Sequence, residues 1–250
     1  MIWQIIKKEF LGYFYSPIGM IVLAVFAGVA GLYFFSAVMD FLLKTTPSQF
    51  VIFIKGYNVN TNLLIPFFTR IQGLMVIVIP VITMRLFAEE RRQGTFELLL
   101  SYPIRPVHLL VGKYLGAFLF TLILLAVSAI YPLYVVIFSD PNVAPILTTY
   151  LGFVLLFSFY VAAGTFASSV TDNQIIAAIL CLAIALSFMI VHWFAVALPS
   201  PFSEVFQHLL LFSHMASFYE GVVFWGYVVV YPSAAAFFLY LTYLKIRVTR

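Results

Sequence analysis

Long apolar stretches alternate along the chain with short segments that hold most of its polar residues. A helix that crosses the hydrocarbon core of a membrane needs about 20 apolar residues, and six stretches are long enough. We expect membrane-spanning helices at residues 18–43, 63–86, 107–138, 147–170, 175–198 and 222–244. The pattern predicts an all-α membrane protein, with residues 1–250 forming a single domain that crosses the bilayer six times.

The amino-acid composition also indicates that lipid, and not water, surrounds most of the protein. Hydrophobic residues make up 64% of the chain and charged residues 9%, whereas a soluble domain carries roughly 25% charged residues. The formal net charge of +4 is not gathered into a basic stripe, so we expect no nucleic-acid partner. The single cysteine, Cys181, lies in an apolar run and has no second cysteine with which to form an intrachain disulfide.

Lysine and arginine residues predict the orientation, because they are enriched in cytoplasmic loops. With the N-terminus inside, ten of them lie on the inner side: Lys7, Lys8, Arg85, Arg91, Arg92, Arg105, Lys113, Lys245, Arg247 and Arg250. Three lie on the outer side: Lys44, Lys55 and Arg70. Both termini are therefore expected in the cytoplasm.

Three shorter segments have features of their own. Residues 1–16 are amphipathic and basic, which is typical of a helix that lies in the membrane interface; a plain juxtamembrane anchor is the alternative. Residues 199–221 are too apolar for a solvated loop, and we expect an outer helical hairpin that folds back on the membrane or re-enters it. The short inner turn at Thr171, Asp172, Asn173 and Gln174 predicts a capping box for the fifth span, in which the Thr171 hydroxyl accepts from a backbone N–H and the Gln174 amide returns the bond.

A charged cluster follows the second span, where five of the eight residues 85–92 are charged. Gly94 then breaks the helix, Thr95 can cap a new one, and Pro103 ends it. The product is a short surface helix at residues 94–103 that carries several leucines. Two interpretations have equal weight on these grounds: a docking element for a soluble partner, or a stop-transfer cluster whose helix packs on the bundle.

The stretch from Ala88 to Pro103, followed by Gly112-Lys113-Tyr114, resembles the permease subunits of ABC-2 type transporters. The closer resemblance is to the permease associated with gliding motility, which is related to the permease of the nitrous-oxide-reductase maturation system. The turn at residues 168–174 also resembles this family. In contrast, residues 217–226 are nearly uncharged, where gliding-type permeases carry a charged stretch.

The resemblance implies a function and a set of partners. The chain would be the permease of a bacterial inner-membrane exporter, paired with a second copy or a paralogue and served by two copies of an ABC ATP-binding subunit. A gliding-type auxiliary membrane protein would be a further partner. The residues carried over to the coupling helix region are Glu89, Glu90, Gly94, Thr95, Glu97, Leu98 and Pro103.

The chain itself is not expected to be an enzyme, because it contains no G-x-x-x-x-G-K-[ST] loop. ATP and Mg²⁺ would bind to the partner ATPase, and no cofactor to this chain. The substrate is not specified by any motif. The alternative function is a module that uses the same ATPase to move an envelope or periplasmic partner without passing a substrate.

Several isolated polar residues have two interpretations each. Arg70 either meets an anionic substrate group or, as we prefer, snorkels to the outer headgroups. Asp40 and Lys113 are expected at the interfaces. Gly112 and Gly116 have the spacing that lets helices approach closely, although lipid-facing glycines are common. The weak candidates for a metal site are Glu204, His208 and His214, whose spacing matches no compact ligand motif, so we expect none.

Overall fold

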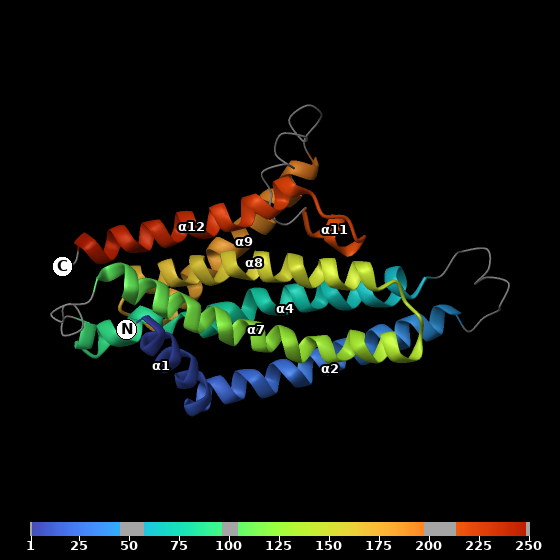
Figure 1. The fold of residues 1–250 in the computed structure, drawn as a ribbon, viewed down its shortest axis with the longest axis horizontal. Helices are drawn as coiled ribbons and strands as arrows, with labels where there is room; N and C mark the ends of the chain where they lie inside the picture. Colours follow the sequence, from blue (N-terminus) through green and yellow to red (C-terminus); the bar gives the residue numbers. More distant parts are fainter. Residues whose placement is uncertain (1, 46–57, 97–104, 198–213, 249–250) are drawn as a thin grey trace.

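A computed structural model describes residues 2–45, 58–96, 105–197 and 214–248. All regular structure in these ranges is helical, and six helices among them are long and apolar enough to cross a membrane. The prediction of an all-α membrane protein with six spans is confirmed. Most of the long helices run along the longest axis of the molecule, and both ends of the chain lie at the same end of the bundle (Figure 1).

The bundle consists of long helices with shorter ones between them. The long helices are α2 (Pro17–Thr45), α4 (Ile65–Thr83), α7 (Pro106–Phe138), α8 (Val143–Val170), α9 (Gln174–Ala197) and α12 (Trp225–Val248). The shorter elements are α1 (Ile2–Tyr15), the π-helical turn η1 (Asn60–Leu64), α5 (Arg85–Arg92) and α11 (His214–Tyr219). The second apolar span runs through η1, α4 and α5 as one stretch, Asn60–Arg92.

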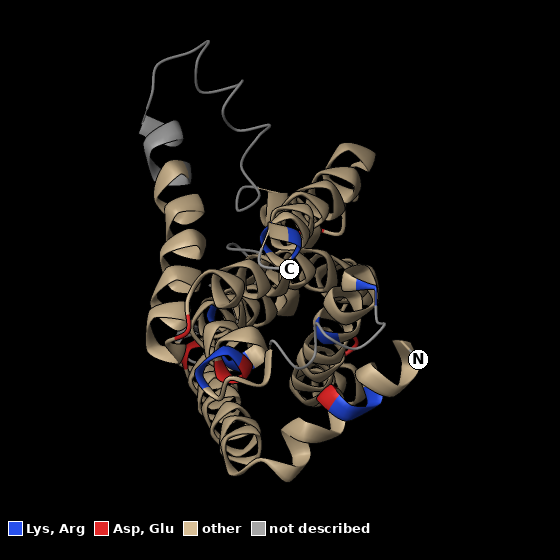
Figure 2. Ribbon diagram, turned by 90° about the vertical axis from the view of Figure 1, so that its left-hand side faces the viewer, with Lys and Arg blue, Asp and Glu red and all other residues tan. Residues whose placement is uncertain are grey.

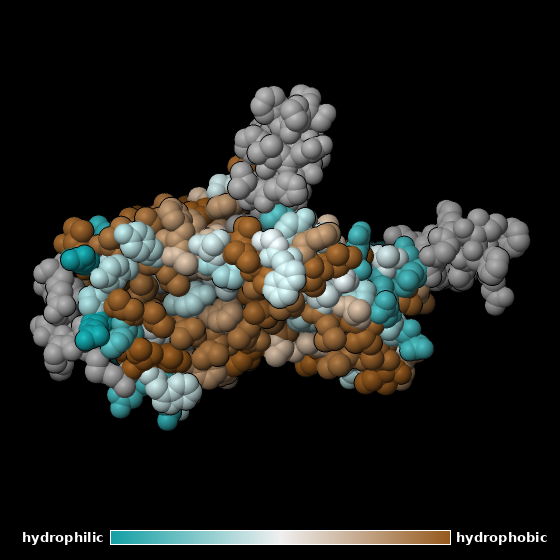
Figure 3. All heavy atoms as spheres, turned by 45° about the horizontal axis from the view of Figure 1, so that its top comes forward, coloured by the Kyte–Doolittle hydropathy of each residue, from teal (hydrophilic) through white to brown (hydrophobic). Residues whose placement is uncertain are grey.

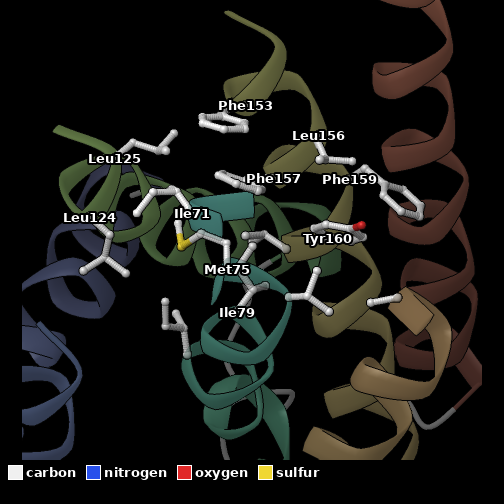
Figure 4. Packing of buried hydrophobic residues seen from close by; sticks show 14 of the residues in the cluster. Ile71, Met75, Ile79, Leu124, Leu125, Phe153, Leu156, Phe157, Phe159 and Tyr160 are labelled. Carbon is white, nitrogen blue, oxygen red and sulfur yellow. The ribbon is translucent and has the colours of Figure 1, made fainter. Parts of the chain in front are cut away.

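Helix α8 is the centre of the bundle. It packs against α4, α5, α7, α9, α11 and α12, and most of its surface is buried. Aromatic and aliphatic side chains fill the space around it: Phe153, Phe157 and Tyr160 from α8 face Ile71, Met75 and Ile79 from α4 (Figure 4). Small residues at Ala162, Ala163 and Ala167 let the neighbouring backbones approach closely.

The outer helices leave their apolar side chains exposed. Only a small share of the residues in α2, α9 and α12 is buried against other helices. Figure 3 shows hydrophobic residues over the middle of the molecule and hydrophilic ones toward its two ends. This is the surface expected of a protein whose middle section is solvated by lipid.

Two of the predicted short elements lie partly outside the described residues. Of the expected outer hairpin at residues 199–221, the structure describes the part from residue 214 onward. There α11 packs on α8, and the Thr148 hydroxyl donates a hydrogen bond to the Phe218 carbonyl at 2.7 Å. Of the expected surface helix at residues 94–103, the structure describes residues 94–96.

Candidate functional site

Charged residues gather at the end of the bundle where α1, α5 and the start of α7 meet, which we call the α1 end (Figure 2). This end also contains the junction between α4 and α5 and the turn between α8 and α9. The residues that the family resemblance assigns to the coupling region begin at this end, with Glu89 and Glu90 in α5.

The junction between α4 and α5 is held by one hydroxyl group of α8. Ser168 Oγ accepts hydrogen bonds from the backbone N–H groups of Phe87 and Ala88, at 2.9 and 3.1 Å, and donates to the Met84 carbonyl at 2.9 Å. The first turn of a helix has N–H groups without partners of its own. Ser168 therefore fixes the start of α5 to the centre of the bundle, a role that sequence analysis missed.

Helix α5 ends in a glycine turn. Gly94 has a φ of +68°, in the left-handed region that favours glycine, and its N–H donates to the Arg91 carbonyl at 3.0 Å. The Thr95 hydroxyl donates to the Glu90 carbonyl at 3.2 Å, which closes the last turn of α5. The remaining predicted coupling residues, Glu97, Leu98 and Pro103, lie outside the described residues.

The core of the α1 end is a buried ionic cluster. The Lys113 ammonium group on α7 lies 2.8 Å from Glu9 Oε1 on α1 and 2.8 Å from Glu90 Oε1 on α5. The Lys113 side chain is 3% exposed. Helices α1 and α5 cover the start of α7 and supply two carboxylates that compensate the loss of water. The expectation that Lys113 lies at the membrane interface stays a prediction.

Two glycines on α7 let α1 approach this cluster. A β-carbon at Gly112 would lie 2.6 Å from Ile5 Cγ2, and one at Gly116 would lie 2.6 Å from Glu9 Cβ. Both distances are shorter than any real contact between carbon atoms. The predicted small-residue spacing thus seats the N-terminal helix of the same chain, with Lys113 between the two glycines.

A second set of contacts ties α1 to α4 and α5. The Arg85 guanidinium donates to Ser16 Oγ at 2.8 Å and lies 4.2 Å from the centre of the Tyr13 ring. The Tyr13 hydroxyl donates to the Ile82 carbonyl at 3.0 Å. Burial raises the pKa of the Tyr13 phenol well above its ordinary value, so the hydroxyl stays protonated and keeps this bond.

The turn between α8 and α9 meets α5 through a charge pair. Arg91 Nη1 lies 3.7 Å from Asp172 Oδ1, and the guanidinium lies 4.9 Å from the centre of the Phe96 ring. The predicted capping box is corrected: the Asn173 side chain, not that of Thr171, accepts from the Ile175 N–H in the first turn of α9. Thr171 Oγ1 instead accepts from the Asn173 N–H, because the backbone turns between these two residues.

A cavity of about 650 Å³ opens at the α1 end beside the ionic cluster. Its walls come from α1, α5, the glycine turn and α7, and its lining residues include Glu89, Glu90 and Thr95 from the predicted coupling region. Lys8 and Arg85 line the same space. The cavity is thus polar, carries both signs of charge, and adjoins the residues at which a docking partner is predicted.

At the opposite end of the bundle, Arg70 contacts α2. Its guanidinium lies 3.0 Å from Asp40 Oδ2 and also donates to Ser36 Oγ and the Tyr33 carbonyl on α2. Neither interpretation included this ion pair, which forms because α2 runs beside α4 and offers a carboxylate within reach; snorkelling to the headgroups stays a prediction. Asp40 is half-exposed in this pair.

The weak metal candidates gain no support. His214 on α11 is buried, and its ring stacks on Tyr227 with 3.8 Å between ring centres. Glu204 and His208 lie outside the described residues. Within the ranges that the structure describes, no three His, Cys, Asp or Glu residues form a group that could hold a metal ion.

The fold defines the class of this protein: a multi-pass helical membrane protein with a charged cluster and a polar cavity at the end that carries both termini. Comparison with known families matches residues 3–244 to the ABC-2 family transporter proteins, and the chain belongs to this family. It is therefore a membrane permease component of an ABC transporter and not the ATPase. A search of curated proteins gave no match.

Proposed function

We propose that this chain couples ATP hydrolysis by a separate ABC ATPase to export across the bacterial inner membrane, and that the ATPase docks at the α1 end. The observation that carries the proposal is the cavity of about 650 Å³ bounded by α1, α5 and α7. It lies beside the glycine turn from which the predicted coupling helix continues. Glu89, Glu90 and Thr95 line it, and all three belong to the predicted coupling region.

The attachment of α5 makes it suited to transmit a push. Ser168 holds its first turn to α8, Asp172 pairs with Arg91 in its last turn, and Lys113 holds Glu90 to α7. A partner that displaces the segment after Gly94 therefore acts on several membrane helices at once. Rigid-body movement of packed elements is a common way to switch between two states.

The proposed assembly contains two permease subunits and two ATPase subunits, and the ATPase holds ATP and Mg²⁺. The second permease is either another copy of this chain or a paralogue. The interior of one copy is filled by large side chains such as Phe153, Phe157 and Tyr160. Any path for a substrate would then lie between two copies and not through one.

Two finer questions belong to the same proposal. A gliding-type accessory membrane protein would be a third component, as the sequence resemblance implies. The alternative function, in which the ATPase moves an envelope or periplasmic partner without passing a substrate, uses the same docking site. The filled interior of one copy supports this alternative as well. The two functions differ in one measurable respect: in the alternative, ATP turnover would depend on the envelope partner and not on a substrate.

The first experiment is purification of the tagged chain in mild detergent, with mass spectrometric identification of the proteins that accompany it. We expect a P-loop ATPase whose turnover is stimulated by the wild-type chain. Gly94→Pro and Glu97→Lys should reduce ATP turnover to the rate of the ATPase alone without reducing membrane insertion. Proline fixes φ near −65° and cannot adopt the value of +68° found at Gly94.

The matched control is Arg247→Gln, which changes an exposed charge in the last turn of α12, outside the cavity lining. It should leave stimulation at the wild-type level. Normal stimulation in both Gly94→Pro and Glu97→Lys would exclude this segment as the coupling element. Recovery of the chain alone, at native expression and with a non-hydrolysable nucleotide present, would contradict the proposed function.

A further inference from the structure

We propose that Lys113 is a positioning residue that forms an ionic joint between α5 and α1, so that movement of the coupling segment turns the N-terminal helix as well as the membrane bundle. The ionic joint consists of Lys113, Glu9 and Glu90. This inference rests on the proposed function, because it assumes that a partner moves α5.

In the ionic joint, a single atom of α7 contacts both α1 and α5. Lys113 Nζ is 2.8 Å from a carboxylate oxygen of α1 and 2.8 Å from a carboxylate oxygen of α5. The same ammonium group lies 5.4 Å from the centre of the Phe87 ring in α5. Each carboxylate side chain is less than one-fifth exposed. Charge-assisted hydrogen bonds of this length are strong and directional, so α1 follows α5 through them.

Stability alone does not account for a charged group at this place. Helix α1 is already seated by apolar contacts, since Ile5 and Glu9 Cβ fit against Gly112 and Gly116, and the Tyr13 ring stacks on Phe120 at 4.6 Å. Replacing a buried ion pair by apolar residues of similar volume is often neutral or stabilising. A lysine between the two glycines therefore points to a task that an apolar side chain would not perform.

The joint also has the means to rearrange. Glu90 Oε2 is buried and has no hydrogen-bond partner among the residues that the structure describes, which leaves this carboxylate only half satisfied there. The adjoining cavity is lined by two further cationic side chains, Lys8 on α1 and Arg85 at the start of α5. When α5 moves, Glu90 can exchange one cation for another without being left alone in a dry environment. This combination favours a joint that changes geometry over a fixed brace.

The test measures whether α1 moves with nucleotide. Nitroxide labels are placed at Lys7→Cys on α1 and Arg247→Cys on α12, both exposed positions, in a Cys181→Ala background. The permease–ATPase complex is reconstituted in lipid nanodiscs, and the distance between the labels is measured by pulsed electron resonance with and without a non-hydrolysable ATP analogue. We expect a shift on the order of 2–5 Å in the wild type, between a helix shift and a one-turn movement.

Glu9→Gln is the informative variant, because it removes the carboxylate that α1 contributes to the ionic joint and leaves the Lys113–Glu90 pair in place. It should lose at least about half of the nucleotide-dependent shift, while its thermal unfolding stays close to that of the wild type. The double variant E9Q/K113M should lose the shift entirely. Asp40→Asn is the matched control, since it removes one carboxylate from the ion pair at the opposite end and should keep the full shift.

Two results would overturn the inference alone: a Glu9→Gln complex with the wild-type shift, or a wild-type complex that turns over ATP without any movement of α1. Failure of an ATPase to bind the wild-type chain would instead overturn the proposed function, and the inference with it. Co-purification is scored in the same preparations, so the two failures are distinguished.

Discussion

An ionic cluster at one end of this bundle and an ion pair at the other both link helices, and the two differ in how far their side chains are removed from water. At the α1 end the Lys113 side chain is 3% exposed and holds two carboxylates. At the opposite end the side chains of Arg70 and Asp40 are 33% and 49% exposed. The distances are similar, 2.8 Å and 3.0 Å, yet the buried cluster joins the three helices α1, α5 and α7, whereas the exposed pair links only α2 and α4. Burial, more than distance, therefore decides how strongly an ionic contact links the helices of this protein.

The largest loss of stability is expected when the buried lysine alone is removed. Lys113→Met leaves Glu9 and Glu90 facing each other without a cation, and removal of one partner from a buried pair costs about 3–5 kcal/mol. We expect that loss in the free energy of unfolding, measured by denaturant titration in detergent. A loss below about 1 kcal/mol would show that water reaches the cluster and that it resembles the pair at the opposite end.

A smaller effect is expected when α1 is displaced without removing a charge. At Gly116→Leu the new side chain meets Glu9 and the backbone of α1, and overpacking of this kind costs about 1–3 kcal/mol. A cysteine placed at Ile6, a buried position of α1 itself, should then react faster with a thiol reagent. Gly28→Leu is the control, because a β-carbon there meets no other atom within 4 Å. Equal labelling rates in both variants would contradict the close seating of α1 on α7.

The smallest effect is expected at the exposed pair. Arg70→Gln and Asp40→Asn, combined in a double-mutant cycle, should give a coupling energy of about 0–1 kcal/mol, because water and side-chain entropy weaken a pair at this exposure. Thermal or denaturant unfolding of the four proteins measures it. A coupling energy above about 3 kcal/mol would show that this pair is as strong as the buried cluster, and would contradict the difference proposed between the two ends.

The six spans were predictable because each of them must satisfy its own backbone in lipid, so that length and hydropathy alone identify it. The burial of Lys113 was not predictable in this way. It depends on a helix 104 positions earlier in the chain that packs over it. A signal was nevertheless present: Gly112 and Gly116 flank the lysine at the spacing of a helix contact, and an amphipathic helix without an assigned partner begins the chain.

Local chemistry was predicted less well where two candidates compete. Thr171 and Asn173 both have side chains that accept from backbone N–H groups, and only the turn geometry selects Asn173 for the first turn of α9. The role of Ser168 could not be foreseen, because its three hydrogen bonds require α5 to lie against α8. The pairing of Arg70 likewise depends on α2 lying beside α4, which no local pattern encodes.

The seating of α1 on α7 has a consequence for how the protein is made. The ribosome releases α1 roughly 100 residues before Gly112 and Gly116, which form its binding surface, are synthesised. During that interval the helix has its apolar face uncovered and lies beside a membrane that already receives the first two spans. Its basic, amphipathic sequence suits it to wait at the lipid surface until the third span is inserted. We therefore expect α1 to associate first with the membrane surface and to join the bundle only after the third span is made.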